Sequence, residues 1–288
     1  MITINNNMYV LDTDNTSYAF AVLGSGQLEH LYYGRKLHAN EAVMTEKHTF
    51  IPGNTNVYNK DYSSYSLEDV CLEMSSLGKG DIREPFIEVT YPNGSSTTDM
   101  VFDRAEIIQG KEEYDTLPGS YDDNGEVEQL VIYLKDRNYN LTLELHYYVY
   151  EKCDIITRSA KLVNSGNESV RLERLMSMQL DLNESDYELS FFNGAWAREM
   201  NRSRISLRAG KYVNESVTGT SSNRANPFFM IGRSSTTEDY GECYGFNLIY
   251  SGNHYEAAQV NSYGKLRLVS GINPATFSYI IEAGKCFE

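Results

Sequence analysis

Hydrophobic and polar residues alternate along residues 141–163, which read LTLELHYYVYEKCDIITRSAKLV. Leu141, Leu143 and Leu145 open a run with period two, and a second run with the same period follows the polar break at residues 151–154. This period over eight or more residues indicates a β-strand with two unlike faces. Two such runs around a short polar turn predict a long antiparallel hairpin. Because the apolar face must be covered, the hairpin also predicts a wide sheet with a second sheet stacked on it.

Shorter runs of the same kind follow one another along the rest of the chain, and no segment of ten or more residues is clearly helical. We therefore predict one all-β domain over residues 1–288, a large two-layer antiparallel sandwich. Residues 38–74 lack periodicity, and a stretch of this length in a compact domain indicates a functional loop or an interaction arm. The strands are expected at residues 2–11, 17–23, 28–33, 86–91, 101–109, 127–134, 170–182, 187–192, 205–208, 228–233, 241–250 (a buried strand), 255–260, 266–270 and 276–281.

The last residues, ATFSYIIEAGKCFE, are typical of a strand, a turn at Ala283 and Gly284, and the beginning of another strand. A strand usually extends over about five or six residues. We therefore expect that the chain is part of a longer protein.

Composition and charge narrow the possible partners. The formal net charge is −15, and no basic cluster exceeds two adjacent residues, such as Arg35 and Lys36, so the chain lacks the basic surface that nucleic acids require. No segment resembles a secretory signal or approaches the ~18 apolar residues of a membrane span. The four cysteines are far apart, which indicates reduced thiols. We expect a cytoplasmic protein that binds neither nucleic acid nor membranes.

The sequence contains no motif for metal, phosphate or nucleophilic chemistry. None of its five histidines has metal-ligand spacing, so we expect no metal and no cofactor. Glycosidases use two carboxyl groups about 5–9.5 Å apart across the sugar. The acidic doublets at residues 112–113 and 122–123 would point to opposite faces of a strand, which favours solvated turns over a catalytic pair.

Two positions are candidates for sugar contact. Asp81 and Arg83 are two residues apart in the loop GKGDIREP, so an extended backbone would direct both side chains the same way. Together they could hold neighbouring sugar hydroxyls, or they could form a local ion pair that fixes the loop. Trp196, the only tryptophan, could stack on a sugar ring or cap the core of the sandwich.

Seven segments, in order, resemble the N-terminal domain of α-galactosidases of glycoside hydrolase family 36. These segments cover nearly the whole chain: LEHLYYG (28–34), GDIREP (80–85), IITRSAKLVN (155–164), NGAWARE (193–199), SSNRANPF (221–228), GECYGFNLIYSGN (241–253) and GINP (271–274). The resemblance implies a β-supersandwich of the galactose-mutarotase-like kind. It also implies a retaining mechanism whose two catalytic Asp residues lie in a (β/α)8 barrel after residue 288. No catalytic residue is then expected in this chain, which would be inactive alone.

The resemblance further implies a tetramer in which this domain builds interfaces and borders the pocket for raffinose- or melibiose-type sugars. The loop at residues 38–64 would reach a neighbouring subunit, and Phe50 matches an aromatic residue of the relatives there. Lys47 and Ser63 stand where relatives have Asp and Arg, and Asn223 and Arg224 also depart from the family pattern.

Two other functions remain open from the residues themselves. The chain could be a stand-alone carbohydrate-binding or mutarotase-like protein, which would need a His and a Glu facing one sugar, with His146 or His254 as the candidates. It could instead be a structural assembly module without a ligand.

Overall fold

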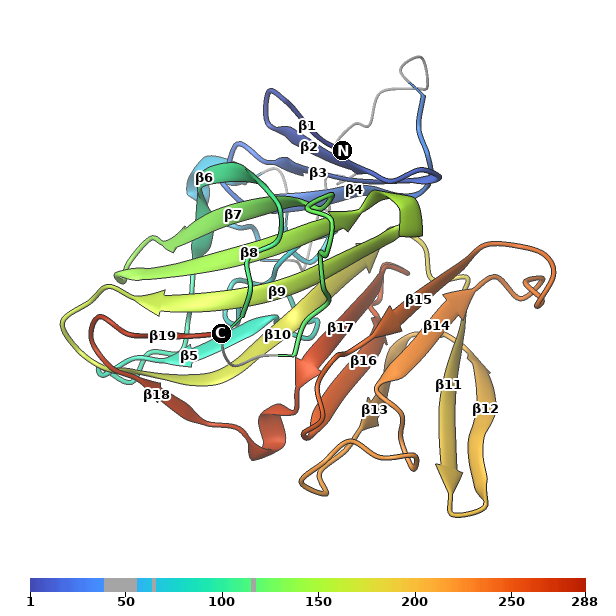
Figure 1. Cartoon of the computed structure of the whole chain (residues 1–288). Helices are drawn as coiled ribbons and strands as arrows, with labels where there is room; N and C mark the ends of the chain where they lie inside the picture. Colours follow the sequence, from blue (N-terminus) through green and yellow to red (C-terminus); the bar gives the residue numbers. More distant parts are fainter. Residues whose placement is uncertain (39–55, 64–65, 115–117) are drawn as a thin grey trace.

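The computed structural model describes residues 1–38, 56–63, 66–114 and 118–288. Antiparallel strands dominate these residues, which contain three single 3-10 turns and no α-helix. The prediction of an all-β chain is confirmed. The strands form four sheets (Figure 1).

The long hairpin predicted from the alternating pattern is present. Strands β8 (Leu141–Tyr150) and β9 (Ile155–Asn164) pair along their whole length. The turn between them ends at Asp154, whose φ of 54° is left-handed. The Asp154 carboxylate accepts hydrogen bonds from the Thr13 hydroxyl at 2.7 Å and the Asn15 amide at 2.8 Å. These bonds fasten the hairpin turn to the N-terminal sheet.

The hairpin forms the centre of a five-stranded sheet in the order β19-β9-β8-β7-β6. Its leucines at 141, 143 and 145 are buried, as the pattern predicts, but His146 and Tyr148 on the opposite face are buried as well. The second face is therefore also covered, in part by Tyr114. The other strands of this sheet are β6 (Met100–Gln109), β7 (Glu128–Asp136) and β19 (Cys286–Phe287).

A six-stranded sheet is built around β10 (Val170–Leu182), whose bounds match the predicted strand. The first half of β10 pairs with β5 and β18, and the second half pairs with β17, with a register shift between Met176 and Met178. This sheet contains β5 (Ile87–Thr90), β13 (Gly210–Glu215), β16 (His254–Val260), β17 (Leu266–Ile272) and β18 (Tyr279–Ile281).

The N-terminal sheet shows one error of the sequence-based prediction. Residues 2–11 form two strands rather than one, because the chain reverses at Asn6, whose φ is 56°. An asparagine adopts this left-handed conformation more readily than most residues, so the Asn-rich run at residues 5–7 permits a tight turn. The sheet consists of β1 (Ile2–Asn5), β2 (Met8–Asp12), β3 (Thr16–Val22) and β4 (Leu28–Arg35).

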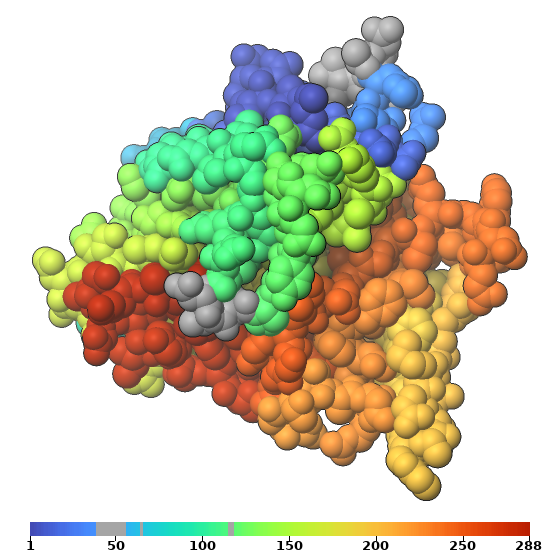
Figure 2. Space-filling model, viewed as in Figure 1, coloured from blue at the N-terminus to red at the C-terminus, as the bar shows by residue number. Residues whose placement is uncertain are grey.

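The fourth sheet has the order β12-β11-β14-β15 and includes the hairpin of β11 and β12, which projects from the edge of the molecule (gold in Figures 1 and 2). The prediction of a buried strand at residues 241–250 is wrong, because β15 alternates between exposed and half-buried residues at the rim of this sheet. Its strands are β11 (Glu188–Ala195), β12 (Arg198–Ser206), β14 (Phe228–Gly232) and β15 (Cys243–Asn247).

One hydrophobic core joins the four sheets, with Tyr9, Leu143, Leu268 and Phe229 among its buried members. Tyr9 stacks on Phe20 at 5.1 Å between ring centroids, and Phe20 stacks on Tyr147 at 5.4 Å. Such aromatic pairs add to the stability gained from burial. Some of the 23 tyrosines of the chain, such as Tyr9 and Tyr147, therefore have a structural role. Across the described ranges, no helix has the length and apolar character needed to span a bilayer.

Candidate functional site

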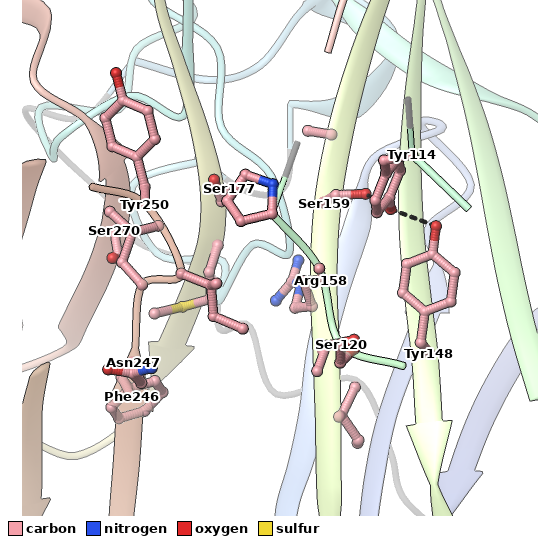
Figure 3. A pocket seen from close by; sticks show the side chains of 18 of the residues that line it. Tyr114, Ser120, Tyr148, Arg158, Ser159, Ser177, Phe246, Asn247, Tyr250 and Ser270 are labelled. Atoms are coloured by element: carbon pink, nitrogen blue, oxygen red, sulfur yellow. Dashed lines mark hydrogen bonds between the residues drawn. The ribbon is translucent and has the colours of Figure 1, made fainter. Parts of the chain in front are cut away.

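A cavity of about 530 Å³ opens between strand β9 and the segment that runs from β15 to Tyr250. In Figure 3, Tyr114, Tyr148 and Ser159 form one wall, and Phe246, Asn247, Tyr250 and Ser270 stand on the opposite wall. Apolar side chains make up much of the remaining lining, including Ile155, Ile156, Met176 and Ile272. Its size lies in the range of small-molecule sites, which are mostly apolar with a few placed polar groups.

Hydroxyl groups concentrate on the β8–β9 wall of this cavity. The Tyr114 hydroxyl shares hydrogen bonds with the Tyr148 hydroxyl and with Ser159 Oγ. A second pair joins Ser120 Oγ to the Tyr150 hydroxyl. Burial raises the pKa of the Tyr114 phenol, so at neutral pH this wall offers neutral groups that can both donate and accept hydrogen bonds.

Arg158 lies between the two walls (Figure 3), and its guanidinium is paired with a carboxylate in the protein interior. Its guanidinium lies 3.3 Å from the buried Glu73 carboxylate, which also accepts hydrogen bonds from the hydroxyls of Tyr18 and Tyr147. Burial would raise the pKa of Glu73, but Arg158 and His30 bring this pKa below its ordinary value. Glu73 is therefore a paired carboxylate in the protein interior, and its contacts fix Arg158 at the cavity.

Asp81 and Arg83 lie away from this cavity, in a buried network of ion pairs. Arg83 donates two side-chain hydrogen bonds of 2.9 Å to Asp81, and its Nη1 lies 3.1 Å from Asp181. Arg267 joins both carboxylates, at 2.8 Å from Asp81 and 2.6 Å from Asp181. Burial opposes the ionisation of Asp81, yet Arg267 and Arg83 lower its pKa.

These contacts favour the ion-pair alternative for Asp81 and Arg83. The predicted placement of the two side chains on the same side is confirmed by their direct contact. Their polar atoms face Asp181, Arg267 and backbone carbonyls rather than an open surface. Asp81 and Arg83 could therefore affect sugar binding only indirectly, by fixing the conformation of the loop in which they lie.

Trp196 occupies the tip of the β11–β12 hairpin with 89% of its surface exposed. Ala197, next to it, has a φ of 62°, and Gly194 lies so close to Arg198 and Glu199 that a Cβ could not fit. The alternative in which Trp196 caps the core is wrong, because the hairpin carries it away from the sheets. Stacking on a sugar remains a prediction.

The predicted contact at Phe50 lies outside the described residues, as does Lys47. Ser63 follows the 3-10 turn Lys60–Tyr62 and is exposed. In the described part of the chain, no three His, Cys, Asp or Glu side chains are grouped as metal ligands would be.

Sequence reasoning missed the cavity residues. The alternation along residues 141–150 places Tyr148 on the polar face of a strand, and nothing local indicates that Tyr114, 34 residues earlier, shares a hydrogen bond with it. A usable signal was the abundance of tyrosine around residues 147–150. The partners across the cavity, Phe246 and Ser270, could be assigned only once the sheet order was known.

The fold and the cavity define an all-β domain with a hydroxyl-rich, mostly apolar site and no cluster of metal ligands among its described residues. The model of the glycosyl hydrolase family 36 N-terminal domain matches residues 26–282. The chain belongs to this family, and the resemblance stated from the seven segments is confirmed.

Similar proteins agree in sequence and structure. The chain is 34% identical to alpha-galactosidase AgaA of Geobacillus stearothermophilus over 284 residues, which is 96% of this chain and 38% of that protein. It superimposes on the alpha-galactosidase from Lactobacillus brevis with a TM-score of 0.93 and 35% identity, covering 99% of this chain and 39% of the other. For AgaB of G. stearothermophilus the TM-score is 0.95 at 31% identity, with 100% and 39% covered. The chain thus spans about two fifths of the length of these relatives.

Proposed function

We propose that this chain is the non-catalytic N-terminal domain of a retaining α-galactosidase. The family match over residues 26–282 carries the proposal. The relatives are α-galactosidases more than twice as long as the chain. The catalytic pair of Asp residues would lie in a (β/α)8 barrel beyond residue 288, where barrel enzymes carry such groups at the C-terminal ends of strands.

The chemistry of the cavity supports a non-catalytic role. Hydrolysis by a glycosidase needs two carboxyl groups that flank the scissile bond. Among the described residues that line the cavity, Glu288 is the only acidic one. Asp81 and Asp181 do lie close together, but two arginines hold both of them as buried ion pairs, so neither can act as an acid or a nucleophile on a sugar.

The substrate and assembly form the second part of the proposal. Structures of AgaA variants contain stachyose and raffinose, and we propose that the full protein acts on oligosaccharides with terminal α-galactosyl groups. In this proposal the four sheets stack as the two layers of a supersandwich, which holds a cytoplasmic tetramer and borders the barrel's pocket. Phe50 and Trp196 are the residues of this chain proposed to approach the sugar.

A deletion tests the role of the domain. The product of the longer reading frame and the same product lacking residues 1–288 are compared for hydrolysis of raffinose and for molar mass by light scattering. We expect the deletion to abolish the tetramer and to reduce raffinose hydrolysis at least tenfold. Equal activity and equal mass for the two proteins would refute the proposed role.

The stand-alone alternative has less support. His254 and Glu256 do lie two residues apart on β16, but both side chains are buried. His146 is buried against Gln129, at 3.0 Å from its amide nitrogen. Neither histidine presents an open surface to a sugar in this structure.

A further inference from the structure

A cross-strand row that includes three polar side chains extends from the cavity into the six-stranded sheet. Asn214, Glu256, Ser270 and Met178 are cross-strand neighbours on β13, β16, β17 and β10. Residues directly opposite each other in antiparallel strands present their side chains on the same face. Because Ser270 and Met178 line the cavity, Glu256 and Asn214 lie on the face of the sheet that the cavity borders.

Several buried polar atoms of this region have no hydrogen-bond partner within the described chain. Ser270 and Thr157 line the cavity, and their Oγ and Oγ1 atoms are unpartnered. Glu256 Oε1 and both ring nitrogens of His254 are unpartnered as well, on the β16 residues that pair with the lining residues Ser270 and Ile272. His254, Glu256 and Ser270 are all more than nine-tenths buried. A buried polar atom without a partner costs stability, and the great majority of such atoms in proteins are paired. The two unpartnered hydroxyls that line the cavity, those of Thr157 and Ser270, indicate a ligand with polar groups.

The charges at the cavity favour a neutral ligand over an anion. The Lys111 ammonium lies over the rings of Tyr114 and Tyr148, at 4.5 and 5.1 Å from their centroids. The Arg158 guanidinium is paired with Glu73 at 3.3 Å. Both cations that line the cavity are therefore already engaged, and the one acidic lining residue, Glu288, would repel an anion. The other polar groups are mainly hydroxyls and the amide of Asn247.

Aromatic and hydroxyl groups face each other across the cavity. Phe246 and Tyr250 stand on one wall, opposite Tyr148 and Ser159 (Figure 3). A pyranose ring has an apolar face that packs on aromatic carbon and a rim of hydroxyls that both donate and accept. We propose that this cavity is a binding site for a neutral saccharide, in which Thr157 and Ser270 bond the sugar hydroxyls. This inference stands independently of the proposed α-galactosidase activity.

Saturation-transfer NMR on the 288-residue chain tests the site, with raffinose and methyl α-galactoside as neutral probes and galacturonate as an anionic one. We expect the neutral sugars to bind and galacturonate to bind less. Thr157→Val keeps the shape and removes one hydroxyl, and Ser270→Ala removes the other. Each variant should weaken binding several-fold, and the double variant roughly tenfold or more, as expected for two lost hydrogen bonds.

Two variants serve as matched controls. Ser234→Ala and Ser235→Ala each remove an exposed hydroxyl on the loop between β14 and β15, outside the cavity lining, and should leave binding unchanged. Urea unfolding of every variant separates lost binding from lost folding, and Thr157→Val tests the site alone if Ser270→Ala fails to fold. The proposal would be overturned by an absence of saturation transfer at millimolar sugar, by unchanged affinity in the double variant, or by an equal loss of binding in Ser235→Ala.

Discussion

Replacing Arg267 with methionine is expected to destabilise the chain by about 3–5 kcal/mol, the scale measured when one partner of a buried ion pair is removed. Arg267 is fully buried and bonds both Asp81 and Asp181. Its loss leaves two buried carboxylates with only Arg83 between them. Methionine fills part of the volume of the arginine side chain. The decrease in the free energy of unfolding would therefore come more from the unpaired charges than from lost packing. Urea unfolding, followed by far-ultraviolet circular dichroism, measures the free energy.

Arg171→Met is the matched control. Arg171 lies on β10 with its side chain 57% exposed, and its nearest acidic partner, Glu173, is 3.9 Å away. Exposed pairs of this kind contribute about 0–1 kcal/mol. The free energy of unfolding of the control should therefore be close to that of the unaltered chain. If Arg267→Met and Arg171→Met cost the same, the network around Asp81 does not hold the loop in place.

Replacing Glu256 with glutamine is expected to stabilise the chain at alkaline pH and to have little effect under acidic conditions. Burial raises the pKa of Glu256 to about 8, partly offset by the hydrogen bond from Asn214. In the unfolded chain the carboxyl group has an ordinary pKa of about 4.3. Between these two values the folded protein binds a proton that the unfolded protein has released, so stability falls as the pH rises.

The size of the effect follows from the same pKa difference. At 1.36 kcal/mol for each pKa unit, the stability lost between pH 4.5 and pH 8 is on the order of a few kcal/mol. Glutamine has the same shape and no charge. The stability of the variant should therefore not show this decrease between pH 4.5 and pH 8. Urea unfolding at pH 5, 7 and 9 gives the difference curve between the two proteins, which also removes the opposite contributions of Glu73 and Asp81. A flat difference curve would mean that Glu256 ionises freely in the folded protein.

The sequence predicts strands well where the residue pattern alone determines them. The β8–β9 hairpin and β10 follow from period-two alternation, and their bounds agree with the prediction. The turn at Asn6 was missed, and the strand that contains β15 was wrongly predicted to be buried. In both places the local pattern is compatible with a longer or more buried strand, and only the position of the neighbouring sheets decides between the possibilities.

Contacts between distant residues were harder to predict. Asp81 and Arg83 could be paired from their spacing, but their partners Asp181 and Arg267 are about 100 and 185 residues further along the chain. The sugar-facing role proposed for Asp81 and Arg83 from their spacing therefore could not be distinguished from a structural role. Trp196 could not be placed either, since a loop tryptophan is equally compatible with a core cap and an exposed tip.

The family assignment depended on short ordered motifs rather than on any single residue. Motifs such as GDIREP and NGAWARE contain residues that the structure places in demanding positions. Arg83 of the first is buried in the ion-pair network, and Gly194 of the second has no room for a side chain. A substitution at Arg83 would leave Asp81 and Asp181 short of a partner, and any side chain at Gly194 would collide with the backbone of Arg198 and Glu199.

We propose that this domain is part of an α-galactosidase and carries none of its catalytic residues. Hydrolysis of an aryl α-galactoside, measured at equal molar concentrations for the purified 288-residue chain and the product of the longer reading frame, tests this claim most directly. We predict no turnover above the buffer blank for the 288-residue chain and steady release of the aryl group by the longer protein. Turnover by the 288-residue chain itself, or none by the longer protein, would contradict the claim.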